Sequence, residues 1–168
     1  MNHPEPMAAA LARGVAGEFR RRLQGEYVPR IGQCVARLDE RQLWQRPAAN
    51  CNSVGNLLLH LRGNVTQWIL AGLGGQPDQR QRPAEFAAET GPSGRELCDA
   101  LAATVAAACA VVDRLGPAGL LAQRTIQGYT ETGLSATLHV LEHFSGHAGQ
   151  IYAWTKQVTG DDLRFYDL

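Results

Sequence analysis

HVLEHFSGHAGQ, residues 139–150, lies in the last long helix that the sequence predicts, from about residue 134 to 158 with Gly160 as its stop. Three of the five histidines in the chain recur in this stretch at intervals of four residues, namely His139, His143 and His147. Residues four apart share one face of a helix, about 6 Å apart along its axis. The face turns by about 40° at each such step, and the outer pair is about 12 Å apart. We therefore expect one adjacent pair to hold a metal ion, with the third histidine beside it.

In three segments that precede this stretch, apolar residues recur at three- and four-residue steps, which predicts amphipathic helices. These helices are expected over residues 8–38, from 52 or 53 to about 73, and over 93–115. Pro29 should kink or interrupt the first of them. Asn52 or Ser53 is the expected N-cap of the second, and Ser93 with Glu96 forms a capping box at the start of the third.

The remaining segments are shorter or irregular. A short helical turn is expected between Asp39 and Pro47, and 72–83 and 120–135 are predicted as loops, the latter with a short extended piece. No segment alternates convincingly between apolar and polar residues as a half-buried strand does. The predicted fold class is all-α, a four-helix bundle with a short extra helical turn. We expect one domain over residues 8–168, preceded by a flexible tail over residues 1–7.

Composition argues against two classes of partner. The chain has 16 basic and 16 acidic residues, a formal net charge of zero, so it offers no large positive field for nucleic acid or an anionic membrane. No stretch approaches the roughly 20 apolar residues of a membrane span, and the N-terminal residues do not resemble a signal peptide. The four cysteines lack metal-type spacing. We therefore expect a cytoplasmic protein with reduced thiols and a small-molecule substrate.

A pair of histidines is rarely a complete metal site, and the remaining candidate is His60 on the second helix. It lies among leucines, with Asn56 and Asn64 one turn to either side on its own face. Bundles build metal sites from inward side chains on facing helices. Three imidazoles suit zinc, nickel, iron or copper and leave a position open for water or substrate. The alternative is a hydrogen-bonded core histidine, and spacing alone leaves the two hypotheses equally weighted.

A second motif overlaps the first. His139, Glu142 and His143 spell H-x-x-E-H, the inverted zinc peptidase signature, in which the two histidines bind zinc and the glutamate is the base. That class has a further acidic ligand well downstream. No glutamate follows Glu142, and only 25 residues follow His143. We therefore disfavour this interpretation.

Four stretches, in this order along the chain, resemble the DinB/YfiT-like superfamily, within it a bacterial subgroup of unknown function. They are GEYVPRIGQC, LDERQLWQRP, NSVGNLLLHLRGNVTQWI and HVLEHFSGHAGQIYAWTK. The resemblance implies a four-helix bundle, often a homodimer, with a divalent metal ion on three histidines. Carried over residue by residue, the ligands are His60, His143 and His147, and His139 lies one turn before them.

Relatives in that superfamily include thiol-dependent enzymes, such as a mycothiol-dependent maleylpyruvate isomerase and a bacillithiol transferase. The resemblance therefore suggests a metal-dependent transferase that uses a small thiol. A metal-dependent hydrolase and a non-catalytic metal-binding stress-response module are the alternatives. Zinc or nickel is the expected ion, with iron or manganese as alternatives. Five residues are expected in the surroundings of the ion or its pocket: Gln150, Asn56, Asn64, His139 and Glu142.

Overall fold

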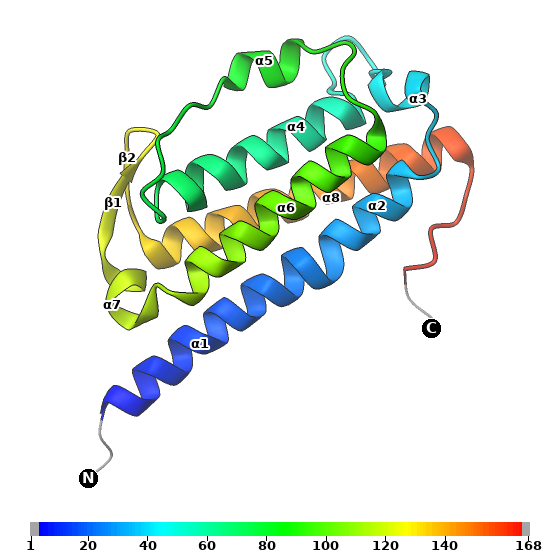
Figure 1. Cartoon of the computed structure of the whole chain (residues 1–168). Helices are drawn as coiled ribbons and strands as arrows, with labels where there is room; N and C mark the ends of the chain where they lie inside the picture. Colours follow the sequence, from blue (N-terminus) through cyan, green and yellow to red (C-terminus); the bar gives the residue numbers. More distant parts are fainter. Residues whose placement is uncertain (1–3, 166–168) are drawn as a thin grey trace.

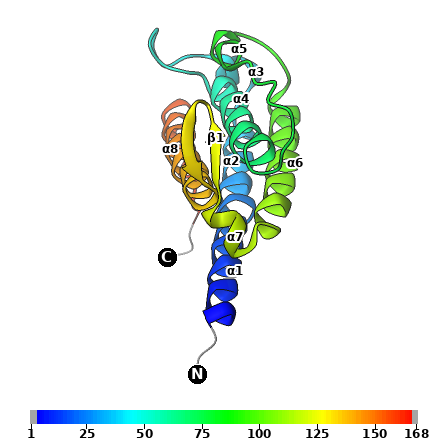
Figure 2. The same ribbon diagram turned by 90° about the vertical axis from the view of Figure 1, so that its left-hand side faces the viewer.

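Four helical segments pack side by side in the computed structural model, which describes residues 4–165 (Figure 1). The first is built from α1 (Pro4–Arg22), the π-helical turn η1 (Leu23–Tyr27) and α2 (Val28–Val35). The second joins α4 (Val54–Val65) to the π-helical turn η2 (Thr66–Ala71), the third is α6 (Gly94–Asp113), and the fourth is α8 (Gly133–Thr159). In the view turned by 90°, α8 and α6 lie on either side of α4 and the first segment (Figure 2). The predicted all-α bundle is confirmed.

One hydrophobic core joins the four segments, as the apolar stripes predict. Each segment contributes large side chains that are almost fully buried, among them Phe19, Leu61, Leu101 and Phe144. Burying a side chain of this size removes it from water and stabilises the fold by about 1.5–3 kcal/mol. The core therefore fixes which faces of α4 and α8 meet.

Side chains at the helix ends set where the helices begin. Ser53 and Ser93 accept hydrogen bonds from the backbone N–H groups of Asn56 and Glu96, and each forms a complete capping box. α8 ends at Gly160, whose φ of 73° is a left-handed conformation that glycine adopts without a steric penalty. These N-caps and this stop were expected from the sequence.

Pro29 interrupts the first helix by widening it. Proline has no N–H group and its ring displaces the carbonyl four residues earlier, so the regular hydrogen-bond ladder cannot continue. The residues before Pro29 form the π-helical turn Leu23–Tyr27, and α-helix follows again as α2. The long first helix therefore persists, although Pro29 changes its pitch.

Several short elements lie outside the four segments. The expected short turn is α3 (Glu40–Trp44), whereas α5 (Arg82–Ala87) and α7 (Gly116–Leu121) were not predicted. A β-hairpin joins β1 (Gln123–Ile126) to β2 (Tyr129–Thr132) in the region expected to be irregular with a short extended piece. Of the eight strand residues, Ile126 alone is buried, so the sequence shows no alternation there.

The N-terminal boundary differs from the prediction. α1 begins at Pro4, so residues 4–7, expected in a flexible tail, are helical, while residues 1–3 lie outside the described part of the chain. Prolines in the first turn are compatible with a helix, because the first N–H groups have no partner within it. None of the described helices is both long enough and apolar enough to cross a membrane.

Candidate metal centre

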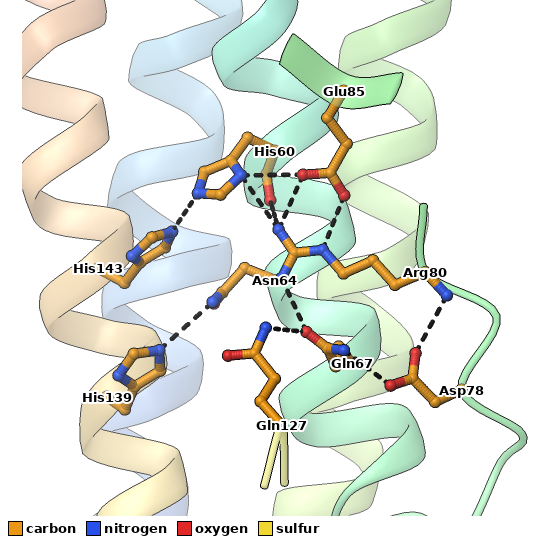
Figure 3. A network of polar contacts seen from close by, with 9 residues as sticks. All are labelled: His60, Asn64, Gln67, Asp78, Arg80, Glu85, Gln127, His139 and His143. Atoms are coloured by element: carbon orange, nitrogen blue, oxygen red, sulfur yellow. Dashed lines mark hydrogen bonds and ion pairs between the residues drawn. The ribbon is translucent and has the colours of Figure 1, made fainter. Parts of the chain in front are cut away.

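Three histidines meet where α4 crosses the middle of α8. His60 comes from α4, and His143 and His147 come from successive turns of α8. One ring nitrogen from each lies within 4.8 Å of the others, and Nε2 of His60 is 3.0 Å from Nε2 of His143 (Figure 3). Imidazole nitrogens at these separations could hold one metal ion. Among the described residues, no other group of histidine, cysteine, aspartate or glutamate side chains meets this condition.

A carboxylate fixes the orientation of the buried His60 ring. Nδ1 of His60 lies 2.9 Å from Oε2 of Glu85, a residue of α5 (Figure 3). A carboxylate only accepts hydrogen bonds, whereas Nη2 of Arg80, which lies 3.0 Å from the same nitrogen, only donates them. That Nη2 has other acceptors in Oε2 of Glu85, at 2.8 Å, and the backbone carbonyl of His60, at 3.5 Å, so we assign the hydrogen to Nδ1, which donates it to Glu85. Nε2 then has a free lone pair, and it faces His143. This is the tautomer that a metal ligand requires, because the second nitrogen donates outward.

Arg80 holds that carboxylate with two parallel hydrogen bonds. Its Nε donates to Oε1 of Glu85 at 2.7 Å, and its Nη2 donates to Oε2 at 2.8 Å. The Arg80 side chain is 3% exposed. Burial raises the pKa of the Glu85 carboxyl, but the hydrogen bonds from Arg80 and His60 outweigh it and hold the pKa below its usual value. Glu85 is therefore ionised at neutral pH and available to the histidine.

The helix that carries Glu85 is itself held against α4. Nδ2 of Asn56 donates to the backbone carbonyls of Glu85, at 2.9 Å, and of Ala88, at 2.7 Å. Gly63 leaves the space that the carboxylate occupies, because a Cβ atom there would lie 2.0 Å from Oε1 of Glu85. In η2, which continues α4, Gln67 accepts a hydrogen bond from Arg80 and donates one to Asp78.

Gln150 orients the last histidine of the cluster. Nδ1 of His147 lies 2.9 Å from Oε1 of Gln150, so the ring donates to the amide oxygen and leaves Nε2 unprotonated. Burial lowers the pKa of His147, against the opposing effect of this hydrogen bond. Burial, and the neighbouring imidazoles of His147 and His60 after it, lower the pKa of His143 to about 3. Both rings are thus neutral at pH 7, as metal ligands must be.

His139 lies beside the cluster and is not part of it. Its ring stacks on Trp68, with 3.8 Å between centroids and 24° between planes, and Nδ2 of Asn64 lies 3.4 Å from its Nε2. Burial lowers its pKa. The three histidines whose ring nitrogens lie within 4.8 Å of one another are His60, His143 and His147, without His139. The H-x-x-E-H interpretation, which requires His139 as a ligand, has no support in this arrangement.

Solvent reaches the cluster from the outer side of α8. An open depression of about 470 Å³ is lined there by His139, Glu142, His143, Gly146, His147 and Gln150. Glu142 is exposed at the rim of this depression. His60 is 3% exposed and does not line the depression. A small molecule can therefore approach His143 and His147 without any movement of the helices.

Around the histidines, one expected pocket residue, Asn56, lies elsewhere, and two residues that were not expected, Glu85 and Arg80, are present. Asn56 was expected at the pocket, but its side chain is turned away to cap α4 and to hold α5. Glu85 and Arg80 were not predicted, because they lie in and beside a stretch taken as a loop, 20–25 residues beyond His60. Pro83 next to Arg82 was the one available signal, since proline favours the first turn of a helix.

Comparison with known proteins agrees with this arrangement of helices. Among solved structures, the chain is similar to the crystal structure of a DinB-like protein, YjoA, from Bacillus subtilis. The TM-score is 0.64 at 14% sequence identity, and the match covers 89% of this chain and 93% of that one. At this identity the likeness shows the fold alone, and it confirms the expected DinB-like bundle. No curated protein matches the chain. A family model described as a protein of unknown function, DUF1572, matches residues 17–167, and the chain belongs to that family.

Proposed function

We propose that His60, His143 and His147 bind one divalent transition-metal ion, zinc or nickel before iron or manganese, and that the protein is a metal-dependent enzyme. Its proposed reaction is the transfer of a small thiol to an organic electrophile. The observation that carries this proposal is the convergence of three imidazoles at a point open to solvent on one side.

The donor set fits such an ion. Two of the three rings are fixed in the tautomer that leaves Nε2 free, His60 by Glu85 and His147 by Gln150. Outer partners of this kind orient metal-bound imidazoles and raise their basicity. All three donors are nitrogens, which favours zinc, nickel and iron over magnesium or calcium.

An open coordination position supports an enzyme over a structural site. Of the two residues that the sequence offered as a fourth ligand, His139 is stacked on Trp68, and Glu142 is exposed at the rim. Three protein ligands with an open position are typical of catalytic sites, whereas structural zinc sites have four. An ion on three neutral ligands keeps its double positive charge and is a Lewis acid that favours the ionised form of a bound thiol or water.

The chain's own residues divide the remaining tasks. Glu85 and Arg80 keep His60 in one orientation, and Gln150 does the same for His147. Trp68 and the stacked His139 close the groove between α4 and α8 on one side of the histidines. In the proposed transfer, the thiol gives its proton to solvent and its sulfur forms a bond to the electrophilic carbon. The leaving group departs with the electron pair of the bond that breaks.

Cobalt substitution tests the open position. Added cysteine should change the visible spectrum of the cobalt-loaded protein through a new sulfur-to-metal band. A variant without the four cysteines of the chain should respond in the same way, because none of them belongs to the histidine cluster. A response to azide but not to thiols would favour the hydrolase. Indifference to both would show a closed, structural site.

A further inference from the structure

The groove between α4 and α8 continues past the histidines in one direction. The two helices run antiparallel, since Asn64 faces His139 while His60 faces His143. Trp68 and His139 close one end. Toward the other end, Leu57 precedes His60 by about one turn and Gln150 follows His147 by about one turn. Both walls of the groove therefore lead away from the cluster into the next cavity.

That cavity, the α4–α8 cleft, has a volume of about 360 Å³ and lies between these helices and the connection before α4. It shares Gln150 with the depression over His143 and His147. Its volume lies at the lower end of the range typical of small-molecule sites, about 300–1,000 Å³. A molecule in the cleft would therefore reach the open side of the histidine cluster at Gln150.

The lining of the cleft is uncharged. Its apolar part includes Val54, Leu57 and the ring of Trp154, and its polar part is made of amides, among them Asn52 and Gln157. None of the ten lining residues carries a charge. A charged ligand group would lose hydration there without gaining an ion partner, which is unfavourable. A groove with charged groups, Arg62 among them, does exist on α4, but none of the three histidines lines it.

We propose that the α4–α8 cleft binds the organic substrate, an uncharged and partly apolar molecule with carbonyl, amide or hydroxyl groups. The apolar side chains take its hydrocarbon part, and the amides of Asn52 and Gln157, for which no hydrogen-bond partner is found among the described residues, take its polar groups. This assignment rests on the proposed function for the reaction, but the cleft and its chemistry do not depend on the ion.

Two dyes that differ by one charge test the assignment. N-phenyl-1-naphthylamine is neutral, and 1-anilinonaphthalene-8-sulfonate adds a sulfonate to the same rings. Titrations with the metal-free, zinc-loaded and cobalt-loaded full chain should show the neutral dye binding at least about tenfold tighter in each case, a difference of about 1.4 kcal/mol. Cobalt should quench the bound neutral dye and zinc should not, because the dye lies beside the cluster.

Ala153 offers a variant that fills the cleft from its exposed side. Ala153→Phe should weaken binding of the neutral dye at least about tenfold. The matched control, Ala106→Phe, adds the same side chain on the exposed face of α6 and should leave binding unchanged. Equal affinities in the two variants, tighter binding of the sulfonate, or no quenching by cobalt that is bound to the histidines would each overturn the proposal. If no metal binds to the histidines, quenching is not a test; the affinities of the two dyes and the two variants then decide whether the cleft stands, and the proposed function fails.

Discussion

Replacing Glu85 by glutamine tests how the protein prepares His60 for a metal ion. The change keeps the shape of the side chain and removes the charge that accepts from Nδ1 of His60 at 2.9 Å. It also removes the partner of the buried Arg80 guanidinium. The amide can present its nitrogen or its oxygen to the ring, so His60 is no longer restricted to the tautomer with a free Nε2.

The size of the effect follows from that contact. A hydrogen bond to a charged group contributes about 1.5–3 kcal/mol, which corresponds to about 10–100-fold in a binding constant. Loss of an outer partner of a metal-bound histidine has an effect of the same size, about 10–100-fold. We therefore expect Glu85→Gln to weaken zinc binding about 10–100-fold. Stability should also fall, because the Arg80 charge remains buried without its partner.

Competition with a chromophoric chelator at fixed pH measures the zinc affinity. The matched control is Glu142→Gln, which removes the same charge at the exposed rim of the depression, where no hydrogen bond to the histidines is found. Chemical denaturation of each metal-free variant identifies the fraction folded, and nitrogen NMR of the histidine rings reports the tautomer of His60 directly. Equal zinc affinities for the two folded variants, with His60 still protonated at Nδ1, would refute the role given to Glu85.

Gly63→Ala should weaken zinc binding by displacing the Glu85 carboxylate, whereas Gly17→Ala, with open space around its Cβ position, should not; zinc titration of both compares them. In the same titration, His139→Ala should have a small effect, and tight binding should be lost on replacing each proposed ligand with alanine: His60, His143 and His147. The pKa of His143, lowered to about 3 by burial and neighbouring imidazoles, predicts that the metal-free protein loses stability as pH falls. Below about pH 6.5 the unfolded chain takes up a proton that the folded chain does not, so stability falls down to the folded pKa. Denaturation curves measured from pH 7 to 4 give the free energy of unfolding at each pH. Its slope against pH should be smaller for His143→Asn than for the unmodified chain, and an unchanged slope would contradict this.

Much of the fold follows from local signals. The apolar stripes predict the four helical segments, Ser53 and Ser93 predict two of their starts, and Gly160 predicts the end of α8. Local rules suffice there because a capping side chain acts within one turn of its helix. The hairpin gave no signal, since Ile126 is its one buried residue.

The candidate site is less local, and prediction of it is less complete. Spacing places His143 beside both His139 and His147 on one helix, and it offers His60 as the remaining candidate ligand. Spacing cannot say which of the two pairs binds, and the resemblance supplied that step. Glu85 depends on how α5 folds back over α4, which no spacing reveals (Figure 1). Asn56 was expected to face the pocket because it lies one turn before His60. As the third residue of a capping box, it turns to Ser53 and α5 instead.

X-ray absorption at the zinc edge, on the zinc-loaded variant without cysteines, measures directly whether three histidines hold an ion with an open position. We expect one zinc ion per chain with nitrogen and oxygen neighbours at about 2.0–2.1 Å, including three imidazoles. Addition of a small thiol should then introduce one sulfur neighbour at about 2.3 Å. Zinc that does not remain bound, or a spectrum with fewer than three imidazoles that ignores the thiol, would contradict an open three-histidine centre.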